Sequence, residues 1–391
     1  MSASAKAAND APRRALEFTD AHEIFRASVR RFFETECAPQ QHAWEEAGVA
    51  PRAIWKRAGE LGFLCPRVEE DYGGLGADFL FSVILAEEQA RAGVIAPMLP
   101  LHSDVMAPYI ANYGTHEQKQ RFLPGMVSGE RIGALAMTEP SGGSDLQAML
   151  THARRDGDDY VINGSKTFIT NGACADLIVL AAKTDRGAGG RGISLFLIET
   201  DKAQGFRRGR TLEKLGQKAS DTAELFFDDV RVPAAALLGD VEGRGFAQLM
   251  ERLVEERLMA AVSSSAMIDR ALALTIQYVK DRRAFGKRVL DFQNTRFRLA
   301  EAKTEATVLR VFLNRCIVDF MAGELDAATA AALKYWATEQ QCAIVDDCVQ
   351  LHGGYGYILD YPIAKMWVDG RITRIYGGAN EIMKDIIGRT L

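Results

Sequence analysis

The segment Leu249–Met259, LMERLVEERLM, determines how we interpret the rest of this 391-residue chain. It contains no Gly or Pro and is rich in Leu, Met, Glu and Arg, so it is predicted to be helical. At helical spacing Leu249, Leu253 and Ala260 form an apolar stripe, and Glu256 falls on that stripe. One carboxylate of the helix is therefore expected to face an apolar environment.

The other acidic residues of this segment, Glu251 and Glu255, fall with Arg252 on the opposite side, where we expect a solvated charge pattern. Desolvation raises the pKa of a carboxyl group, which makes Glu256 a candidate general base near neutral pH. The alternative is a structural pair between a helix-face Glu and a buried Arg, because such pairs also perturb carboxyl groups. Periodicity alone does not separate the two interpretations.

Composition indicates an ordinary globular protein of two or three domains, with 48% hydrophobic and 25% charged residues. The net charge of −5 argues against a nucleic-acid binder, and we expect no membrane association, because no segment is apolar for the roughly 20 residues of a spanning helix. The six cysteines form no CxxC pair and the histidines show no metal-ligand spacing, so neither disulfides nor a metal site is expected. These scattered cysteines indicate that the protein occupies a reducing compartment, which is the cytoplasm or, in a eukaryote, the mitochondrial matrix.

Hydrophobic periodicity predicts an α+β multidomain fold with a disordered tail over residues 1–17. A helical domain is expected over 18–129, a compact antiparallel β domain over 130–240 and an antiparallel four-helix bundle over 241–391. Expected N-terminal helices are Thr19–Glu36, 51–61, Phe79–Ala92, Ser103–Tyr113 and one from Glu117 that stops before Pro124. Expected strands are Ile132–Met137, Tyr160–Ile162, Leu177–Ala182, Ile193–Ile198 and Ala223–Phe227, and the bundle helices are 245–283, 292–322, 326–350 and 362–387.

Two segments of the β domain have the composition of ligand-binding loops. MTEPSGGSD (Met137–Asp145) follows the first strand, and its glycines and Ser144 suit a pyrophosphate, although Gly/Ser loops are common. FITNG (Phe168–Gly172) places an aromatic ring two residues from a Thr hydroxyl, on one face if the segment is a strand. The ring is suited to cover a planar group while the hydroxyl bonds its edge, and an ordinary half-buried strand is the alternative.

Three further segments interrupt the helical C-terminal region. RRAFGK (Arg282–Lys287) brings cations and an aromatic ring to a helix end. QLHGGYGY (Gln350–Tyr357) and IYGGANE (Ile375–Glu381) place glycine pairs where glycine is costly. The backbone at these pairs is expected to turn or to approach another group closely.

Taken together, these five motifs resemble the acyl-CoA dehydrogenase family, in the family's order and over the whole chain from about Phe18. In most of that family the catalytic base is a Glu after the Tyr of a YEGT-like motif, where this chain has Gly377. The long-chain and isovaleryl-type branch carries its base on a bundle helix immediately before an Arg, which matches Glu256 before Arg257. The resemblance thus agrees with the position of Glu256 on the apolar stripe. It assigns the role of base to Glu256, with Glu255 as the second candidate.

The resemblance implies a flavin enzyme with FAD lying between the β domain and the bundle. Phe168 takes the place of an aromatic residue that covers the ring, and Ala379 departs from the usual Thr, which removes one hydroxyl contact. The implied cofactor-binding residues are Met137, Thr138, Gly143, Ser144, Phe168, Ile169, Thr170, Arg282, Phe285, Gln293, Gln350, Gly353, Gly354, Ala379, Asn380 and Glu381. The implied substrate-binding residues are Ser144, Leu253, Arg257, Gly377 and Gly378.

The reaction implied by the resemblance is α,β-dehydrogenation of an acyl-CoA thioester to a trans-2-enoyl-CoA, in fatty-acid or branched-chain oxidation. The thioester carbonyl would be polarised by the N–H of Gly377 and a flavin ribityl hydroxyl while Glu256 removes the α proton. The β hydrogen would leave as hydride to the flavin, and the electrons would pass to an electron-transfer flavoprotein. Because Arg282, Phe285, Gln293, Gln350 and Gly354 match positions that reach a neighbouring subunit's FAD, a homotetramer built as a dimer of dimers is implied.

Other functions remain compatible with these residues. One is a flavin oxidase or monooxygenase on the same fold, and another is a dehydrogenase of acyl-carrier-protein thioesters. A third is a non-catalytic binding protein, because Gly377 leaves the commoner base position empty. The acyl chain length cannot be deduced from the residues, although the small Gly377 favours longer or branched chains.

Overall fold

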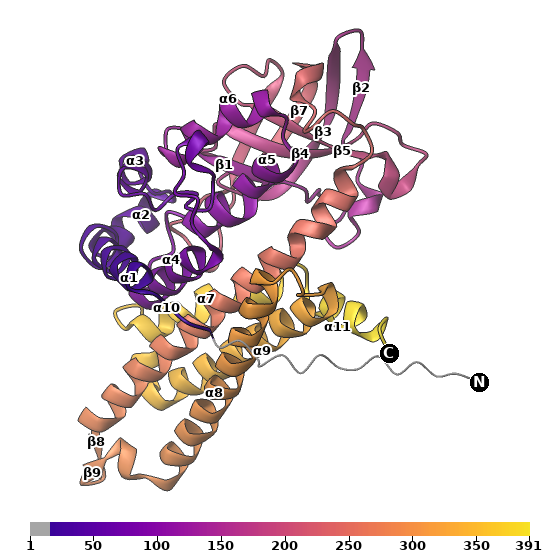
Figure 1. Cartoon of the computed structure of the whole chain (residues 1–391). Coiled ribbons are helices and arrows are strands. Elements are labelled where there is room, and N and C mark those ends of the chain that lie inside the picture. The colour runs from indigo at the N-terminus through magenta and orange to yellow at the C-terminus, as the bar shows by residue number, and fades with distance from the viewer. Residues whose placement is uncertain (1–15) are drawn as a thin grey trace, which may run out of the picture.

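The computed structural model describes residues 16–391 (Figure 1). The expected tail over residues 1–17 lies outside this range, apart from Leu16 and Glu17. Along the chain, a helical region is followed by a β-sheet and then by long helices, which confirms the predicted fold class. In Figure 1 the N-terminal helices and the sheet lie on one side of the long helix α7, and α8, α9 and α11 lie on the other.

The N-terminal region contains six α-helices, and its longest connection is the segment 61–78 between the third and the fourth. The first begins where it was predicted, because the Thr19 hydroxyl accepts a hydrogen bond from the His22 backbone N–H and caps the helix. The predicted helix over Phe79–Ala92 is confirmed at both ends, with Asp78 as its N-cap. The helices are α1 (Asp20–Phe32), α2 (Gln41–Ala47), α3 (Arg52–Glu60), α4 (Phe79–Ala92), α5 (Ala107–Tyr113) and α6 (His116–Val127), with π-helical turns at Phe33–Cys37 and Leu101–Met106.

The prediction that the last of these helices stops before Pro124 is wrong, because α6 runs to Val127. Proline removes one backbone donor, but here only one helical turn follows it. That turn buries Met126 in the core, and the Ser128 N–H still bonds to the Pro124 carbonyl at 3.0 Å. The burial of Met126 therefore stabilises this last turn by more than the one hydrogen bond lost at Pro124 costs.

The middle region is a seven-stranded sheet. Its strands are β1 (Gly133–Ala136), β2 (His152–Asp156), β3 (Asp159–Thr170), β4 (Leu177–Lys183), β5 (Ile193–Glu199), β6 (Phe206–Thr211) and β7 (Thr222–Pro233), in the order β1-β4-β2-β3-β7-β6 with β5 also paired to β4. The sheet is not wholly antiparallel as expected, because β1 pairs with β4 in parallel and β2 makes one parallel pair with β4. A β2–β3 hairpin separates β1 from β4 in sequence, which gives the chain room to return in the same direction.

The C-terminal region contains the long helices α7 (Gly245–Asp281), α8 (Gln293–Met321) and α9 (Ala327–His352), with a small β8–β9 hairpin (Arg283–Ala284 and Lys287–Arg288) between the first two. The fourth predicted segment, 362–387, is divided into α10 (Pro362–Gly370) and α11 (Asn380–Gly388). The break includes Gly377 and Gly378, whose φ angles of 63° and 96° are incompatible with a right-handed helix.

Helix α7 takes part in two hydrophobic cores. Leu249 near its start lies in a cluster with α5, α6 and strands β4 and β5, whereas Leu258 and Ile268 lie in the bundle core with α4, α8 and α9. By length and composition α7 is also apolar enough to cross a membrane, which the sequence analysis did not anticipate. Because 67% of its most apolar window is buried inside the structure, this is weak evidence for a membrane span and is typical of a core helix.

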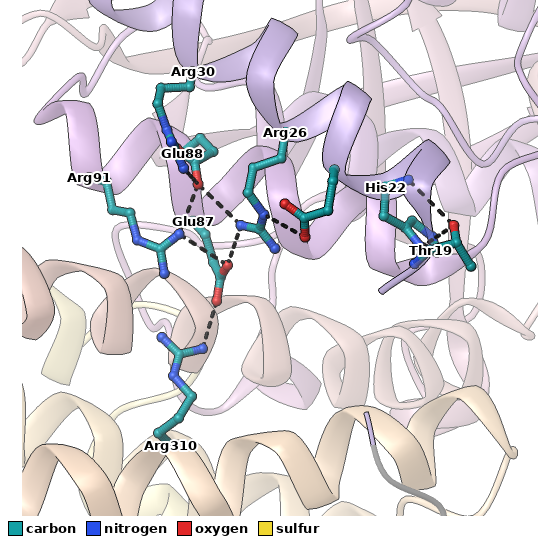
Figure 2. A network of polar contacts seen from close by, with 9 residues as sticks. Thr19, His22, Arg26, Arg30, Glu87, Glu88, Arg91 and Arg310 are labelled. Atoms are coloured by element: carbon teal, nitrogen blue, oxygen red, sulfur yellow. Dashed lines mark hydrogen bonds and ion pairs between the residues drawn. The ribbon is translucent and has the colours of Figure 1, made fainter. Parts of the chain in front are cut away.

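A network of buried charges joins the N-terminal helices to the bundle (Figure 2). Glu87 on α4 is 4% exposed and accepts hydrogen bonds from Arg26 on α1 at 2.9 Å and from Arg310 on α8 at 2.6 Å. Burial raises the pKa of the Glu87 carboxyl, but Arg310, Arg91 and Arg26 outweigh burial and hold this pKa below its usual value. The carboxylate therefore connects three helices from two regions of the chain.

Replacement Glu87→Gln is expected to lower the stability of the protein. It removes the charge that compensates three guanidinium groups, and breaking a buried ion pair in this way costs on the order of 3 kcal/mol. We expect a lower Tm than in the control Glu34→Gln, which makes the same chemical change at an exposed position of the first helical segment. Equal Tm values for the two variants at neutral pH would show that the network contributes little to stability.

Candidate active site

Glu256 lies on α7 opposite the turn that separates α10 from α11. A Cβ atom added to Gly377 would stand 3.6 Å from the Glu256 Oε1 atom, so the carboxylate reaches the backbone of this turn. The Glu256 side chain makes no hydrogen bond or ion pair to any part of residues 16–391 and is half-buried. The structure thus brings together Glu256 and Gly377, the two positions at which the sequence comparison located a base.

The environment of Glu256 favours proton uptake. Burial raises the pKa of its carboxyl group, whereas the positive charges of Arg257 and Lys334 lower it, and burial is the largest effect. The net result is a pKa above the ordinary value of 4.5. A carboxylate of this kind is suited to act as a general base.

Glu255 has the opposite environment to the one predicted. It was expected on a solvated face, but it is 1% exposed, with one carboxylate oxygen bonded to Arg67 and the other to Arg252 at 3.0 Å. Helical periodicity could not predict that Glu255 is buried, because its partner Arg67 is distant in sequence and contacts α7 only in the folded chain. With both oxygens bonded to arginines, Glu255 is a poorer candidate base than Glu256.

The loop Met137–Asp145 is held in place by a buried ion pair. Lys166 on β3 is completely buried, and its ammonium lies 2.9 Å from the Glu139 Oε1 atom and donates a hydrogen bond to the Met137 carbonyl. Glu139 also accepts hydrogen bonds from the backbone N–H groups of Leu150 and Thr151. The rest of the loop remains accessible to a ligand. Its predicted cofactor residues are half-buried (Thr138) or exposed (Gly143 and Ser144).

Phe168 departs from the regular strand that the sequence analysis considered. The pairing of β3 with β7 shifts between Lys166 and Ile169, and Phe168 has a φ of 58°. Its ring is 67% exposed, whereas the neighbouring Ile169 is buried and Thr170 is half-buried. A non-glycine residue in the left-handed region with an exposed ring is uncommon and is typical of a functional position.

A second group of predicted cofactor residues lies at the far end of α7. Arg282, Gln350, Gly353 and Gly354 line a recess of about 500 Å³, and Phe285 nearby is 95% exposed. At the helical rise this end is about 40 Å from Glu256 along the axis. The structure therefore does not bring all the predicted site residues together within one chain.

The remaining predicted residues lie close to Glu256 and the Gly377 turn, except Gln293, which begins α8 after the β8–β9 hairpin at the far end of α7. Leu253 and Arg257 are buried on α7, and the Nε atom of Arg257 has no hydrogen-bond partner within the described residues. Asn380 is buried with its side chain bonded to α9, so only its backbone is free to contact a ligand. Ala379 precedes α11, Gly378 completes the turn, and Glu381 and Gln293 are exposed at the first turns of α11 and α8.

Sequence reasoning missed two buried lysines, Lys166 and Lys334. Each is 0% exposed although lysine is rarely buried. The available signal was their position within apolar segments, in a strand for Lys166 and in a helix for Lys334. Both hold backbone that carries predicted site residues.

Comparison with known proteins identifies all three regions. "Acyl-CoA dehydrogenase, N-terminal domain" matches residues 19–130, "Acyl-CoA dehydrogenase, middle domain" matches 134–230 and "Acyl-CoA dehydrogenase, C-terminal domain" matches 243–391. The chain is 49% identical to the long-chain specific acyl-CoA dehydrogenase of mouse mitochondria over 376 residues, which cover 96% of this chain and 87% of the mouse protein.

Solved structures share the fold. An acyl-CoA dehydrogenase from Geobacillus kaustophilus is 50% identical with a TM-score of 0.94, covering 96% of this chain and 99% of that one. A chain in a structure of the electron transferring flavoprotein of Acidaminococcus fermentans is 35% identical, with a TM-score of 0.92 and coverage of 96% and 99%. A glutaryl-CoA dehydrogenase from Mycobacterium smegmatis in complex with FADH2 is 29% identical, with a TM-score of 0.88 and coverage of 95% of each chain.

The family models match from residue 19 to residue 391, and they agree with the motifs and with the arrangement of the three regions. The protein therefore belongs to the acyl-CoA dehydrogenase family and is an FAD-dependent enzyme that dehydrogenates acyl-CoA thioesters.

Proposed function

We propose that Glu256 is the catalytic base and that Gly377 polarises the thioester. The supporting observation is the Glu256 carboxylate next to the Gly377 turn, 3.6 Å from an added Cβ. A thioester carbonyl that accepts the Gly377 N–H would place its α carbon near Glu256, which removes the α proton. The hydrogen bond stabilises the negative charge that develops on the carbonyl oxygen, and Arg257 and Leu253 border the substrate.

The residues present fit FAD in two places. The exposed Phe168 ring beside Thr170 suits an isoalloxazine ring and its polar edge, next to the Met137–Ser144 loop. In the recess at Arg282, a Cβ added to Gly353 or Gly354 would meet nothing within 4 Å, which leaves room for a phosphate chain against a cation. When bound, FAD accepts the β hydrogen of the substrate as hydride.

We further propose that the two halves of the cofactor site come from different copies of the chain. The separation of about 40 Å between Glu256 and the Arg282 recess supports this, because one FAD cannot bridge that distance within one protomer. A homotetramer built as a dimer of dimers satisfies this requirement, with domains at 18–129, 130–240 and 241–391.

Electrons are proposed to pass to an electron-transfer flavoprotein, in the cytoplasm or, in a eukaryote, in the mitochondrial matrix. The likeness to a chain from such a flavoprotein structure and to a mitochondrial relative supports this. The alternative, an oxidase, is distinguished by the rate at which its flavin is reoxidised. In an oxidase, acyl-CoA bleaches the flavin under anaerobic conditions and oxygen then reoxidises it rapidly. In a dehydrogenase that reoxidation is slow.

The variant Glu256→Gln is expected to retain FAD and to lose turnover by on the order of 10²-fold or more, because the amide cannot accept the α proton. In the unmodified enzyme, kcat/KM is expected to fall as the pH drops through the raised pKa of Glu256, because only the ionised carboxylate is a base. The measurement is kcat and its pH profile with an acyl-CoA and an artificial electron acceptor.

Glu251→Gln is the matched control, because Glu251 lies on the same helix with an exposed side chain. It is expected to keep normal turnover. Substantial activity in Glu256→Gln would assign the base elsewhere, and no activity in any variant or in the unmodified chain would favour a non-catalytic binding protein.

Replacement Gly377→Ala is expected to lower kcat, because a Cβ at a φ of 63° costs about 1–2 kcal/mol and moves the N–H that polarises the thioester. The added methyl would make only ordinary contact with Glu256, so any effect comes from the backbone. Gly388→Ala is the control, since a Cβ there meets open space and φ is not positive. Equal kcat values for the two variants would argue against the role of Gly377.

The acyl substrate is proposed to be long or branched, because Gly377 leaves space that a side chain occupies in enzymes with the commoner base position. The likeness to a long-chain dehydrogenase supports this. We expect higher kcat/KM on long straight or branched acyl-CoAs than on butyryl-CoA in a substrate panel, with the matching carrier-protein thioesters in parallel. Reaction only with four-carbon straight chains would refute the proposal.

A further inference from the structure

Lys334 is a completely buried ammonium on α9 whose hydrogen bonds go only to neutral groups. Its Nζ atom donates to the Gly378 carbonyl at 2.7 Å and to the Asn380 Oδ1 atom at 2.9 Å. Within residues 16–391 no carboxylate lies within 4.0 Å of it, in contrast to Lys166, which has Glu139 at 2.9 Å. A buried charge without an ion pair is costly, so its position calls for an explanation.

The two acceptors of Lys334 are both part of the turn that carries Gly377. Gly378 has a φ of 96° and no side chain, so its own end of the turn is held through its carbonyl, whereas Arg374 at the other end pairs with Glu339 on α9. Asn380, the first residue of α11, donates from its amide to the Thr338 hydroxyl at 3.0 Å and to Glu339 at 2.8 Å. Helix α9 therefore holds the turn at its second glycine and at the residue after Ala379.

Lys334 also lies in the electric field of the active site. The charged groups around it are Glu256 and Arg257 from α7, Glu339 from α9 and Glu381 from α11. The charge of Glu256 also acts on Tyr109 from α5 and on Tyr376 from the turn, where burial and this charge together raise the pKa of each phenol. Burial, together with the positive charge of Arg257, lowers the pKa of Lys334 to about 8, although Glu256 acts in the opposite direction.

We propose that Lys334 is a positioning residue for the dehydrogenation. It fixes the turn that presents the Gly377 N–H to the thioester, and its positive charge keeps the nearby Glu256 ionised before proton transfer. It touches neither substrate nor cofactor and acts through these two groups. The inference rests on the proposed role of Glu256.

The electrostatic and the structural parts of this role predict different effects. Removing the charge raises the pKa of Glu256, since the positive charge of Lys334 now lowers it. The base is then protonated at a higher pH, and the acidic limb of kcat/KM moves upward. The difference from the unmodified enzyme is largest below about pH 8, where Lys334 is charged.

The test compares Lys334→Gln, Lys334→Met and Thr338→Val as FAD-loaded enzymes. Gln retains a donor for the Gly378 carbonyl but no charge, whereas Met removes both. Thr338→Val loosens Asn380 without changing any charge. The measurements are the pH profiles of kcat/KM and of kcat, with flavin content and the visible spectrum of the flavin as controls for folding.

We expect the acidic limb to move up by about one pH unit in both Lys334 variants, which corresponds to about a tenfold lower kcat/KM on that limb. Lys334→Met should in addition have a lower kcat than Lys334→Gln across the pH range. Thr338→Val should lower kcat and leave the limb in place. An unshifted limb in folded, flavin-loaded Lys334→Gln would overturn the inference, as would an equal shift in Thr338→Val.

The outcome for Glu256→Gln separates this inference from the assignment of the base. If Glu256→Gln is inactive and the limb does not move in Lys334→Gln, only the role of Lys334 fails. If Glu256→Gln remains active, the assignment of the base fails, and the inference fails with it.

Discussion

The continuity of α7 is the constraint on which the rest of the structure depends. Its 37 residues extend about 55 Å and contribute to two separate cores, and residues 255–257, between those cores, are buried or half-buried. Two adjacent carboxylates occur there and are compensated differently. Glu255 is bonded to Arg67 and Arg252, whereas Glu256 has no bonded partner and is influenced only by more distant charges. The same helix therefore carries one carboxylate that stabilises the fold and one that remains available for chemistry.

The turn between α10 and α11 brings its backbone close to that free carboxylate. A Cβ added to Gly377 would make only ordinary contact with Glu256, so it is the left-handed conformation, shared by Gly378, that favours glycine there. The two glycines have no side chains of their own to hold this part of the turn. Lys334 on α9 and Asn380 on α11 hold it, and Arg374 pairs with Glu339 earlier in the turn.

Local signals in the sequence predicted the regular elements well. The cap at Thr19 and the apolar pattern of Phe79–Ala92 depend on neighbours a few residues away, which a sequence displays directly. The errors arose where distant segments decide the outcome, as in the parallel pairing of β1 with β4 and the burial of Glu255 by Arg67. The position of Glu256 was predictable because its stripe is local, and the glycine pair Gly377–Gly378 indicated a turn, but the local pattern could not place that turn opposite Glu256.

The two buried lysines show why burial alone does not reveal what a charge does. Lys166 has a carboxylate partner at hydrogen-bond distance, so its charge is compensated by direct contact. Its role is to hold the Met137–Asp145 loop. Lys334 has only neutral acceptors, so its charge is compensated at a longer distance by groups that include Glu256. A charge compensated at a distance responds when that distant group takes up a proton. The proposed base and a buried lysine arranged in this way are therefore coupled through the proposed reaction, whereas a bonded pair such as Lys166 and Glu139 is not.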